Sequence, residues 1–303
     1  MQIKSLSVPF PPEWGKGDAT NVYILNGQSS TFVDAGLDSP SNRKFILRAL
    51  KKDVPHTVDR ILVTHGHLDH FGLSAYIQHE TGAEILIHEA DAEALKDYGT
   101  TLYWFDDVFD LAVEGGFLKE DLISAKLQMV AAIGMMATPK DFKTFTNLEL
   151  DLGEEKVVSI DLPGHTKGSV GYAVGNSIFA GDVAKEGSTL VGIFKDEIAS
   201  IQKLKAFKDV YTGHGRTPIG KKDLEELEAH FISRLEEVLR AAAGGNNLKG
   251  IMESVYPTVM DTGTNFIRKI IPLRQAISYL RYLEEEGYIA KKGPCWTSFK
   301  TAL

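Results

Sequence analysis

Three histidines and one aspartate fall within six positions of one short stretch, at His65, His67, Asp69 and His70. The apolar run before this stretch predicts a buried strand, and the apolar residues after it predict a helix. Two imidazoles two positions apart in an extended loop can hold one ion from the same side. A carboxylate and an imidazole at the start of the next helix can then face a second ion. This set of ligands suits a borderline divalent metal such as zinc.

Three later strands are each followed by one good metal ligand. These ligands are His165, Asp182 and His214, and each comes directly after a glycine, which lets the backbone approach closely. A single histidine after a strand is more often a structural residue. The combined order, His-x-His-x-Asp-His followed by His, Asp and His, predicts a metal site built from the ends of several strands.

The elements that must position these ligands alternate between strands and helices. Asn26-Gly27 is a strong signal for a tight turn, so a hairpin is expected around it. We predict a helix capped by Ser41 that runs through Lys51, and a second helix over residues 69–79. This alternation with short connections indicates sheets covered by helices. Strands are expected at 22–25, 31–33, 61–63, 85–88, 156–160, 170–174, 177–180 and 209–212.

Residues 97–148 break this alternation and predict an inserted helical hairpin, which ends in a long apolar helix over residues 118–136. The aromatic side chains of the insert either belong to the core or line a substrate pocket in a cap over the site. Both interpretations stay open. The aromatics are Tyr98, Tyr103, Trp104, Phe105, Phe109 and Phe117.

The last part of the chain has a different character. Helices are expected at 224–243, 248–256 and 265–286, followed by strands near 288–290 and 296–299. Three helices and a hairpin are typical of a small winged-helix-like module. We therefore predict two domains, a catalytic domain over residues 1–220 and a winged-helix-like domain over residues 221–303.

Composition and charge set limits on the class of protein. The chain has 303 residues, of which 43% are hydrophobic and 24% charged, as is typical of a globular protein with a sizeable core. Its net charge is −8, and residues 221–303 carry 12 basic against 11 acidic side chains. Neither part is strongly basic, so charge alone does not indicate an obligate nucleic-acid-binding protein.

Cysteine usage and hydropathy point to the cytoplasm. The single cysteine, Cys295, excludes an intrachain disulfide and cannot be a main metal ligand. No apolar run approaches the roughly 18 residues of a membrane span, and the first residues do not begin a signal peptide. We expect a cytoplasmic protein that does not associate with a membrane.

The order of the ligands resembles that of the metallo-β-lactamase superfamily, over about residues 1–220. The resemblance implies an α/β (α+β) fold, an αββα sandwich with a dinuclear site at one edge. It implies that Asp182 bridges two metal ions and that Asp34, at the end of a hairpin strand, supports the ligand loop from behind. The nucleophile would be a hydroxide that bridges the metals. The first metal would be held by His65, His67 and His165, and the second by Asp69, His70 and His214.

Departures from the family pattern narrow the activity. The common zinc β-lactamases carry a cysteine where Asp182 stands, and the di-iron flavoproteins carry a glutamate where His67 stands. The chain is instead similar to the glyoxalase II, lactonase and ribonuclease-Z-like hydrolases. The stretch from residues 230–234 to residues 283–288 resembles the winged-helix-like tail of the branch that contains β-lactamase-like protein 2, some members of which cleave single-stranded RNA.

We therefore expect a dinuclear metallohydrolase of an ester, thioester, lactone or phosphodiester, with Asp69 also supplying a proton to the leaving group. Two Zn²⁺ ions fit best, with Mn²⁺ or Fe²⁺ as alternatives. The expected partner is a small ester or phosphodiester substrate, and a homodimer is an open alternative to a monomer. Another alternative is an RNA-processing endoribonuclease whose C-terminal domain binds RNA, and a third is a mononuclear iron sulfur dioxygenase.

Four further residues are secondary site candidates. Lys167 stands where the family motif usually has proline, and it either binds a phosphate or carboxylate or faces solvent. Tyr172 either donates to a developing oxyanion, as a tyrosine does in some lactonases of this fold, or packs in the core. For His88 we favour a structural role. Arg216 is either a substrate clamp or a surface residue.

Overall fold

The computed structural model describes most of the chain. The described residues are 1–10, 18–97, 99, 103–133, 136–153, 155–185, 192–261 and 267–299, and for 103–107, 132–133 and 267–268 only the backbone is described. Among these residues, no helix is both long and apolar enough to cross a membrane. Tyr98 of the predicted aromatic set lies outside the described residues, as do the side chains of Tyr103, Trp104 and Phe105.

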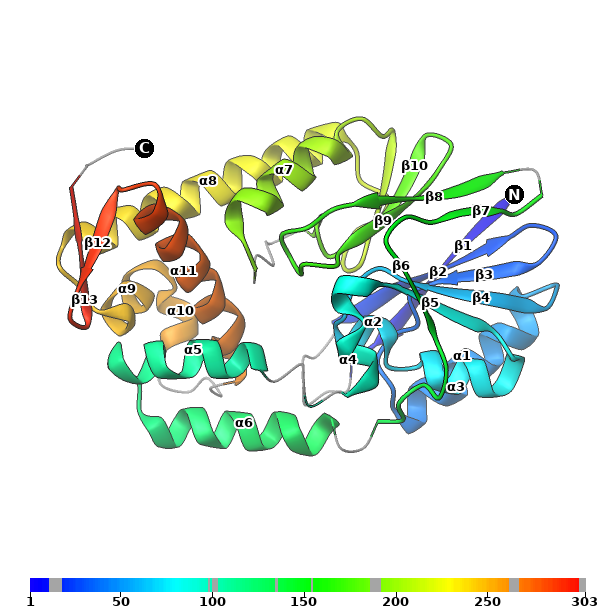
Figure 1. Cartoon of the computed structure of the whole chain (residues 1–303), viewed down its shortest axis with the longest axis horizontal. Helices are drawn as coiled ribbons and strands as arrows, with labels where there is room; N and C mark the ends of the chain where they lie inside the picture. Colours follow the sequence, from blue (N-terminus) through cyan, green and yellow to red (C-terminus); the bar gives the residue numbers. More distant parts are fainter. Residues whose placement is uncertain are drawn as a thin grey trace.

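Two sheets form the body of the molecule (Figure 1). The first has the order β1-β2-β3-β4-β5-β6, in which β1 to β3 are antiparallel and β3 to β6 are parallel. Its strands are β1 (Gln2–Pro9), β2 (Ala19–Asn26), β3 (Ser30–Val33), β4 (Val58–Val63), β5 (Glu84–His88) and β6 (Lys143–Phe145). The expected hairpin around Asn26-Gly27 is confirmed as β2–β3.

The second sheet has the order β11-β10-β9-β8-β7, and only its β10–β11 pair is parallel. Its strands are β7 (Glu149–Asp151), β8 (Lys156–Asp161), β9 (Val170–Val174), β10 (Ser177–Gly181) and β11 (Asp209–Thr212). The strands expected from residue 156 to residue 212 are confirmed. The short strands β6 and β7, and β1 at the start of the chain, were not predicted.

The first sheet is buried on both faces, and its side chains alternate between two cores. In β4, Ile61 and Val63 belong to the core under the helices, whereas Leu62 belongs to the core between the sheets. From the second sheet, Tyr172 and Phe179 enter the same inter-sheet core. The period of two in a strand produces this alternation, and burial on both faces explains why the strands read as continuous apolar runs.

Helices cover the outer faces, which completes the αββα sandwich. The first sheet is covered by α1 (Pro40–Asp53) and α3 (Ser74–Thr81), and the second by α7 (Phe194–Leu204) and α8 (Lys221–Ala243) (Figure 1). The predicted cap of α1 was wrong by two positions. Ser39 is the N-cap, because its hydroxyl accepts from the backbone N–H of Asn42.

The single helix expected over residues 69–79 is also wrong, because two short helices stand there. They are α2 (Leu68–Phe71) and α3. At Gly72 a Cβ would lie 2.9 Å from the backbone nitrogen of Asp38, and the N–H of Leu73 bonds to the carbonyl of Gly36 rather than to its own helix. The helix is therefore interrupted where the backbone packs against the loop after β3.

The insert is a helical hairpin, as predicted, formed by α5 (Tyr103–Glu114) and α6 (Lys119–Ile133). In α5, Val108 and Ala112 are buried in the same core as the C-terminal helices, and Phe117 joins them. On α6, the half-buried Met129 packs against the core of the first sheet. Of the six aromatic residues named above, the two whose side chains are described, Phe109 and Phe117, therefore belong to the core.

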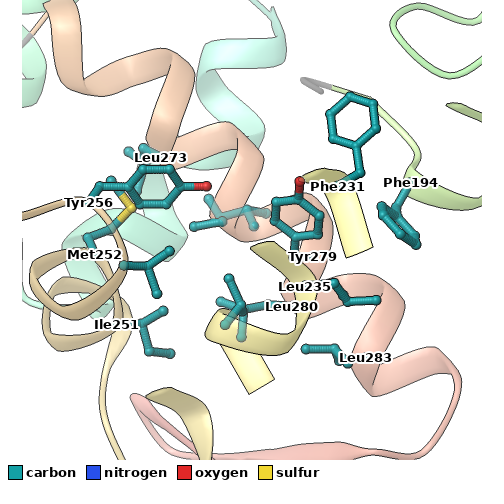
Figure 2. Close-up of a cluster of buried hydrophobic side chains, with 14 of the residues drawn as sticks. Phe194, Phe231, Leu235, Ile251, Met252, Tyr256, Leu273, Tyr279, Leu280 and Leu283 are labelled. Atoms are coloured by element: carbon teal, nitrogen blue, oxygen red, sulfur yellow. The ribbon is translucent and has the colours of Figure 1, made fainter. Parts of the chain in front are cut away.

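The C-terminal region contains the expected three helices and hairpin, with one additional helical turn. Its elements are α8, α9 (Leu248–Val255), α10 (Pro257–Met260), α11 (Ile267–Glu285), β12 (Ile289–Lys292) and β13 (Cys295–Ser298). Figure 2 shows Phe194 of α7 among Phe231 and Leu235 of α8 and Leu280 of α11. The same core reaches Val210 of β11. The two domains at 1–220 and 221–303 stay a prediction.

Candidate metal centre

The predicted ligands lie together at one edge of the sandwich. His65 and His67 follow β4, Asp69 and His70 belong to α2, and the other three follow β8, β10 and β11. In Figure 1, α2 lies at the edge of the sheets that faces the C-terminal helices. Five of the seven side chains are at least 94% buried, and only His67 and Asp69 are half-buried. The five are His65, His70, His165, Asp182 and His214.

The first group of ligand atoms consists of three imidazole nitrogens. His67 Nδ1 lies 3.1 Å from His65 Nε2 and 2.9 Å from His165 Nε2. Two nitrogens of a tetrahedral zinc site are about 3.3 Å apart when each bond is about 2.0–2.1 Å long. The three nitrogens could hold one metal ion.

The second group combines a carboxylate with two imidazoles. His214 Nε2 lies 3.0 Å from Asp69 Oδ2 and 3.3 Å from His70 Nε2, and the latter two atoms are 3.5 Å apart. These three atoms could hold a second ion. The two groups are consistent with a dinuclear metal site.

Asp182 contacts both groups with different oxygens. Its Oδ1 lies 3.2 Å from His70 Nε2 and 3.3 Å from His214 Nε2, while its Oδ2 lies 3.7 Å from His165 Nε2. A carboxylate in this position can bridge two ions. Gly213 permits it, because a Cβ there would lie 2.2 Å from Asp182 Oδ1.

The two groups differ in their electrostatics. Burial lowers the pKa of His65 and His67, so these imidazoles are neutral bases. Burial also lowers the pKa of His214, but Asp182 and Asp69 outweigh it and raise this pKa to about 9. In the metal-free protein His65 and His67 are ready to bind an ion at neutral pH, whereas His214 must first release a proton.

Neighbouring groups fix the far nitrogens of three of the imidazoles. His70 Nδ1 lies 2.8 Å from Asp34 Oδ2, and His214 Nδ1 lies 2.7 Å from the carbonyl of Ala19. His65 Nδ1 lies 3.0 Å from the hydroxyl of Thr64. A proton on each Nδ1 leaves Nε2 with a free electron pair that points into the cluster.

Asp34 supports the ligand loop as expected. Besides His70, its carboxylate accepts from the backbone N–H of Thr64 at 2.8 Å and from the Thr64 hydroxyl at 2.9 and 3.0 Å. It is 2% exposed and has a φ of +61°, a conformation that aspartate and asparagine tolerate better than most side chains.

The predicted role of Tyr172 as an oxyanion donor is wrong. The side chain is fully buried between the sheets, and its hydroxyl donates to the carbonyl of Val63 at 2.7 Å. A hydroxyl that gives its only proton to the backbone and has no exposed surface cannot donate to a substrate. The alternative, core packing, is confirmed.

The other secondary candidates have different outcomes. Lys167 is exposed in the loop after His165, and its role stays a prediction. His88 is structural, because its Nδ1 accepts from the N–H of Ala90 at the start of a short helix. Arg216 forms an ion pair with Asp223 at the start of α8.

Two acids near the ligand loops, the half-buried Asp91 and the buried Glu197, escaped the sequence reasoning. Asp91 lies in the 3₁₀ helix η1 (Glu89–Asp91), and its carboxylate accepts from Gly66 and Thr166. Glu197 of α7 is 1% exposed, and burial raises the pKa of its carboxyl group, which packs against Gly164. A signal for Asp91 existed, because it follows β5, the parallel neighbour of β4, at the edge where strand ends converge.

Comparisons with known proteins identify related sequences. A model of the metallo-beta-lactamase superfamily matches residues 15–217. The beta-lactamase-like protein 2 homolog of Caenorhabditis elegans is 26% identical over 222 residues, which is 72% of this chain and 62% of that protein. A probable metallo-hydrolase of Methanocaldococcus jannaschii is 24% identical over 168 residues, 55% of this chain and 68% of that protein. The chain thus matches less than two thirds of the length of the worm relative.

Two solved structures resemble the whole chain. A metallo-beta-lactamase family protein of Thermus thermophilus has a TM-score of 0.79 at 22% identity and covers 98% of each chain. A beta-lactamase domain protein of Burkholderia ambifaria has a TM-score of 0.82 at 18% identity and covers 98% of this chain and 92% of its own. The shared fold includes the C-terminal region.

Proposed function

The chain belongs to the metallo-β-lactamase superfamily, and from that starting point we propose that it is a metal-dependent hydrolase of ester bonds that uses two divalent ions. The observation that carries the proposal is the position of Asp182, whose two oxygens face two separate groups of ligand atoms. The archaeal relative is named a probable metallo-hydrolase, which supports the same reaction class.

The metal ligands are assigned from the geometry. We propose His65, His67 and His165 for the first ion, and Asp69, His70 and His214 for the second, with Asp182 between them. Zinc suits this set best, and Mn²⁺ or Fe²⁺ would also be held, because affinity alone does not select the ion. Two such ions would lower the pKa of water and polarise the attacked oxygen.

The side chains of the protein hold and orient this centre. Burial raises the pKa of Asp69, but His70 and His214 outweigh it and keep this pKa below its usual range. Asp69 is therefore a carboxylate ligand at neutral pH, and its second expected role, donating a proton to the leaving group, stays a prediction. With 21% of its side chain exposed, Asp69 lies on the open side of the cluster.

The substrate is proposed as a class. An ester, thioester, lactone or phosphodiester each presents an oxygen that can be polarised at such a centre. Lys167 is the exposed cation nearest in sequence to His165, and we propose it as a contact for a substrate phosphate or carboxylate. A homodimer stays an open alternative to a monomer.

RNA cleavage is the weaker alternative. Lys291, a basic side chain of the C-terminal region, bonds to Glu114 at 2.6 Å and lies over the ring of Trp296. Arg234 of α8 bonds to Glu237 at 2.7 Å. Cations that are already paired bind phosphate less well. The alternative of a mononuclear iron dioxygenase is also weaker, because a single ion would use only one of the two groups of ligand atoms.

The test compares two substrates on metal-loaded protein. We would measure kcat/KM for an aryl phosphodiester and for a carboxylic thioester, with the metal content determined on the same sample. Asp182→Ala is the control and is expected to lower either activity by about 100-fold or more, since it removes the group shared by both ions. Activity on neither substrate, or full activity in the variant, would refute the proposal.

A further inference from the structure

Asp91 occupies a position between the two loops that carry the first ligand group. It ends the 3₁₀ helix η1, directly after β5, and β5 is hydrogen-bonded in parallel to β4. One loop, after β4, contains His65 and His67, and the other, after β8, contains His165. The loops are about 100 residues apart in the sequence. The backbone N–H of Val170 bonds to the carbonyl of Thr64 at their base, and Asp91 joins them beside the ligands themselves.

The carboxylate of Asp91 bonds to both loops. Its Oδ2 accepts from the backbone N–H of Gly66 at 2.8 Å and from the hydroxyl of Thr166 at 2.6 Å. Its Oδ1 accepts from the backbone N–H of Gly168 at 2.8 Å. Gly66 stands between two ligands, and Thr166 follows the third.

Two glycines allow this approach. A Cβ on Gly168 would lie 2.6 Å from Asp91 Cγ and 2.7 Å from its Oδ1. A Cβ on Gly66 would lie 3.3 Å from Asp91 Cβ and 2.9 Å from Cβ of the neighbouring Ala94. Neither position is compatible with a larger residue unless the neighbouring atoms move. The glycines and Asp91 therefore form one fitted contact.

Thr166 is held in turn by its own loop. Its hydroxyl lies 2.7 Å from the hydroxyl of Ser169, which also accepts from the backbone N–H of Thr166 at 3.1 Å. The loop thus has a fixed shape of its own, and Asp91 attaches it to the opposite loop. A shift of the attachment would change the 2.9 Å distance between His67 Nδ1 and His165 Nε2.

We propose that Asp91 is a positioning residue for the first metal ion. It contributes no ligand atom to the group, and it fixes the distance between the nitrogens of His65 and His67 on one loop and that of His165 on the other. This inference rests on the proposed function for its metal ion. It does not depend on the identity of the substrate. Support of this kind behind metal ligands commonly changes metal affinity by about 10- to 100-fold.

The test measures cobalt affinity rather than turnover. The full chain first receives His214→Ala, which disables the second group, so that the remaining Co²⁺ reports on the first group through its visible spectrum. Adding Asp91→Ala is expected to weaken Co²⁺ binding about 10- to 100-fold and to change the ligand-field bands. Asp91→Asn keeps one acceptor oxygen and is expected to restore part of the affinity. Glu89→Gln, an exposed acid of the same helical turn, is the matched control and leaves the affinity unchanged.

A milder variant covers the case in which Asp91→Ala does not fold. Thr166→Val deletes one of the three bonds to Asp91 and is expected to weaken Co²⁺ severalfold. Unchanged affinity and spectrum in both variants would overturn the proposal. So would an affinity loss matched by an equal loss in Glu89→Gln. If the wild-type protein hydrolyses neither test substrate but its cobalt binding still depends on Asp91, then only the proposed activity fails.

Discussion

Asp34→Asn isolates the part of the metal centre that sets the protonation of a ligand. The carboxylate accepts from Thr64 through its backbone N–H and its hydroxyl, and from His70 Nδ1 at 2.8 Å. An asparagine has the same shape and tolerates the φ of +61°, so the fold is expected to survive. Its amide oxygen can still accept the hydrogen bonds from Thr64. Its NH₂ group then faces His70 Nδ1 and forces the proton onto Nε2, the atom that should bind the metal.

The size of the effect follows from that single lost contact. A hydrogen bond to a charged group contributes about 1.5–3 kcal/mol. If this energy is lost from metal binding, the affinity of the second group falls by about 10- to 150-fold, because about 1.4 kcal/mol corresponds to a factor of ten. Among the described residues, no imidazole of the first group forms a hydrogen bond with the Asp34 carboxylate. The metal affinity of the first group should therefore change little.

The assay is a competition titration of metal-free protein with Zn²⁺ and a chelator, which resolves two binding steps. Asp53→Asn is the control, because its carboxylate forms an ion pair with Lys4 of β1 rather than a bond to a metal ligand. The expected result is one weakened step and one unchanged step. Equal weakening of both steps, or no weakening at all, would refute the argument from the tautomer of His70.

Two further predictions concern pH and the buried tyrosine. In metal-free protein, the pKa of His214 is raised to about 9 in the folded state, compared with about 6.5 in the unfolded state. The protonated imidazole therefore stabilises the folded protein, and this contribution is complete at pH values below about 6.5. This contribution is lost as the pH rises to about 9, at about 1.4 kcal/mol per pH unit. Thermal unfolding of chelator-treated protein between pH 6 and 10 should show the decline, and a metal-loaded sample should not; a flat profile for the metal-free protein would contradict the assignment. Tyr172→Phe should lower the free energy of unfolding by about 1–3 kcal/mol, because the carbonyl of Val63 loses its partner. Its kcat should stay within about twofold of wild type, and a large fall in kcat at unchanged stability would restore the oxyanion role.

Local chemistry made much of this protein readable from its sequence. The seven candidate ligands could be identified because each is a rare residue type for its place, just after a strand or at the start of the next helix, and next to another candidate or a glycine. Strands and helices could be identified because their apolar periods are local. The helix break at Gly72 could not, since it depends on contacts with Asp38 and the loop after β3.

Tertiary structure decided how the ligands are held and which neighbours take part. The bond from Tyr172 to Val63 joins residues 109 positions apart, and the bond from Thr166 to Asp91 joins residues 75 positions apart. Local periodicity does not predict either bond, because each depends on which strands become neighbours. The sequence by itself determined which atoms could bind metal, and the packing of the two sheets determined which carboxylates and hydroxyls fix those atoms in place.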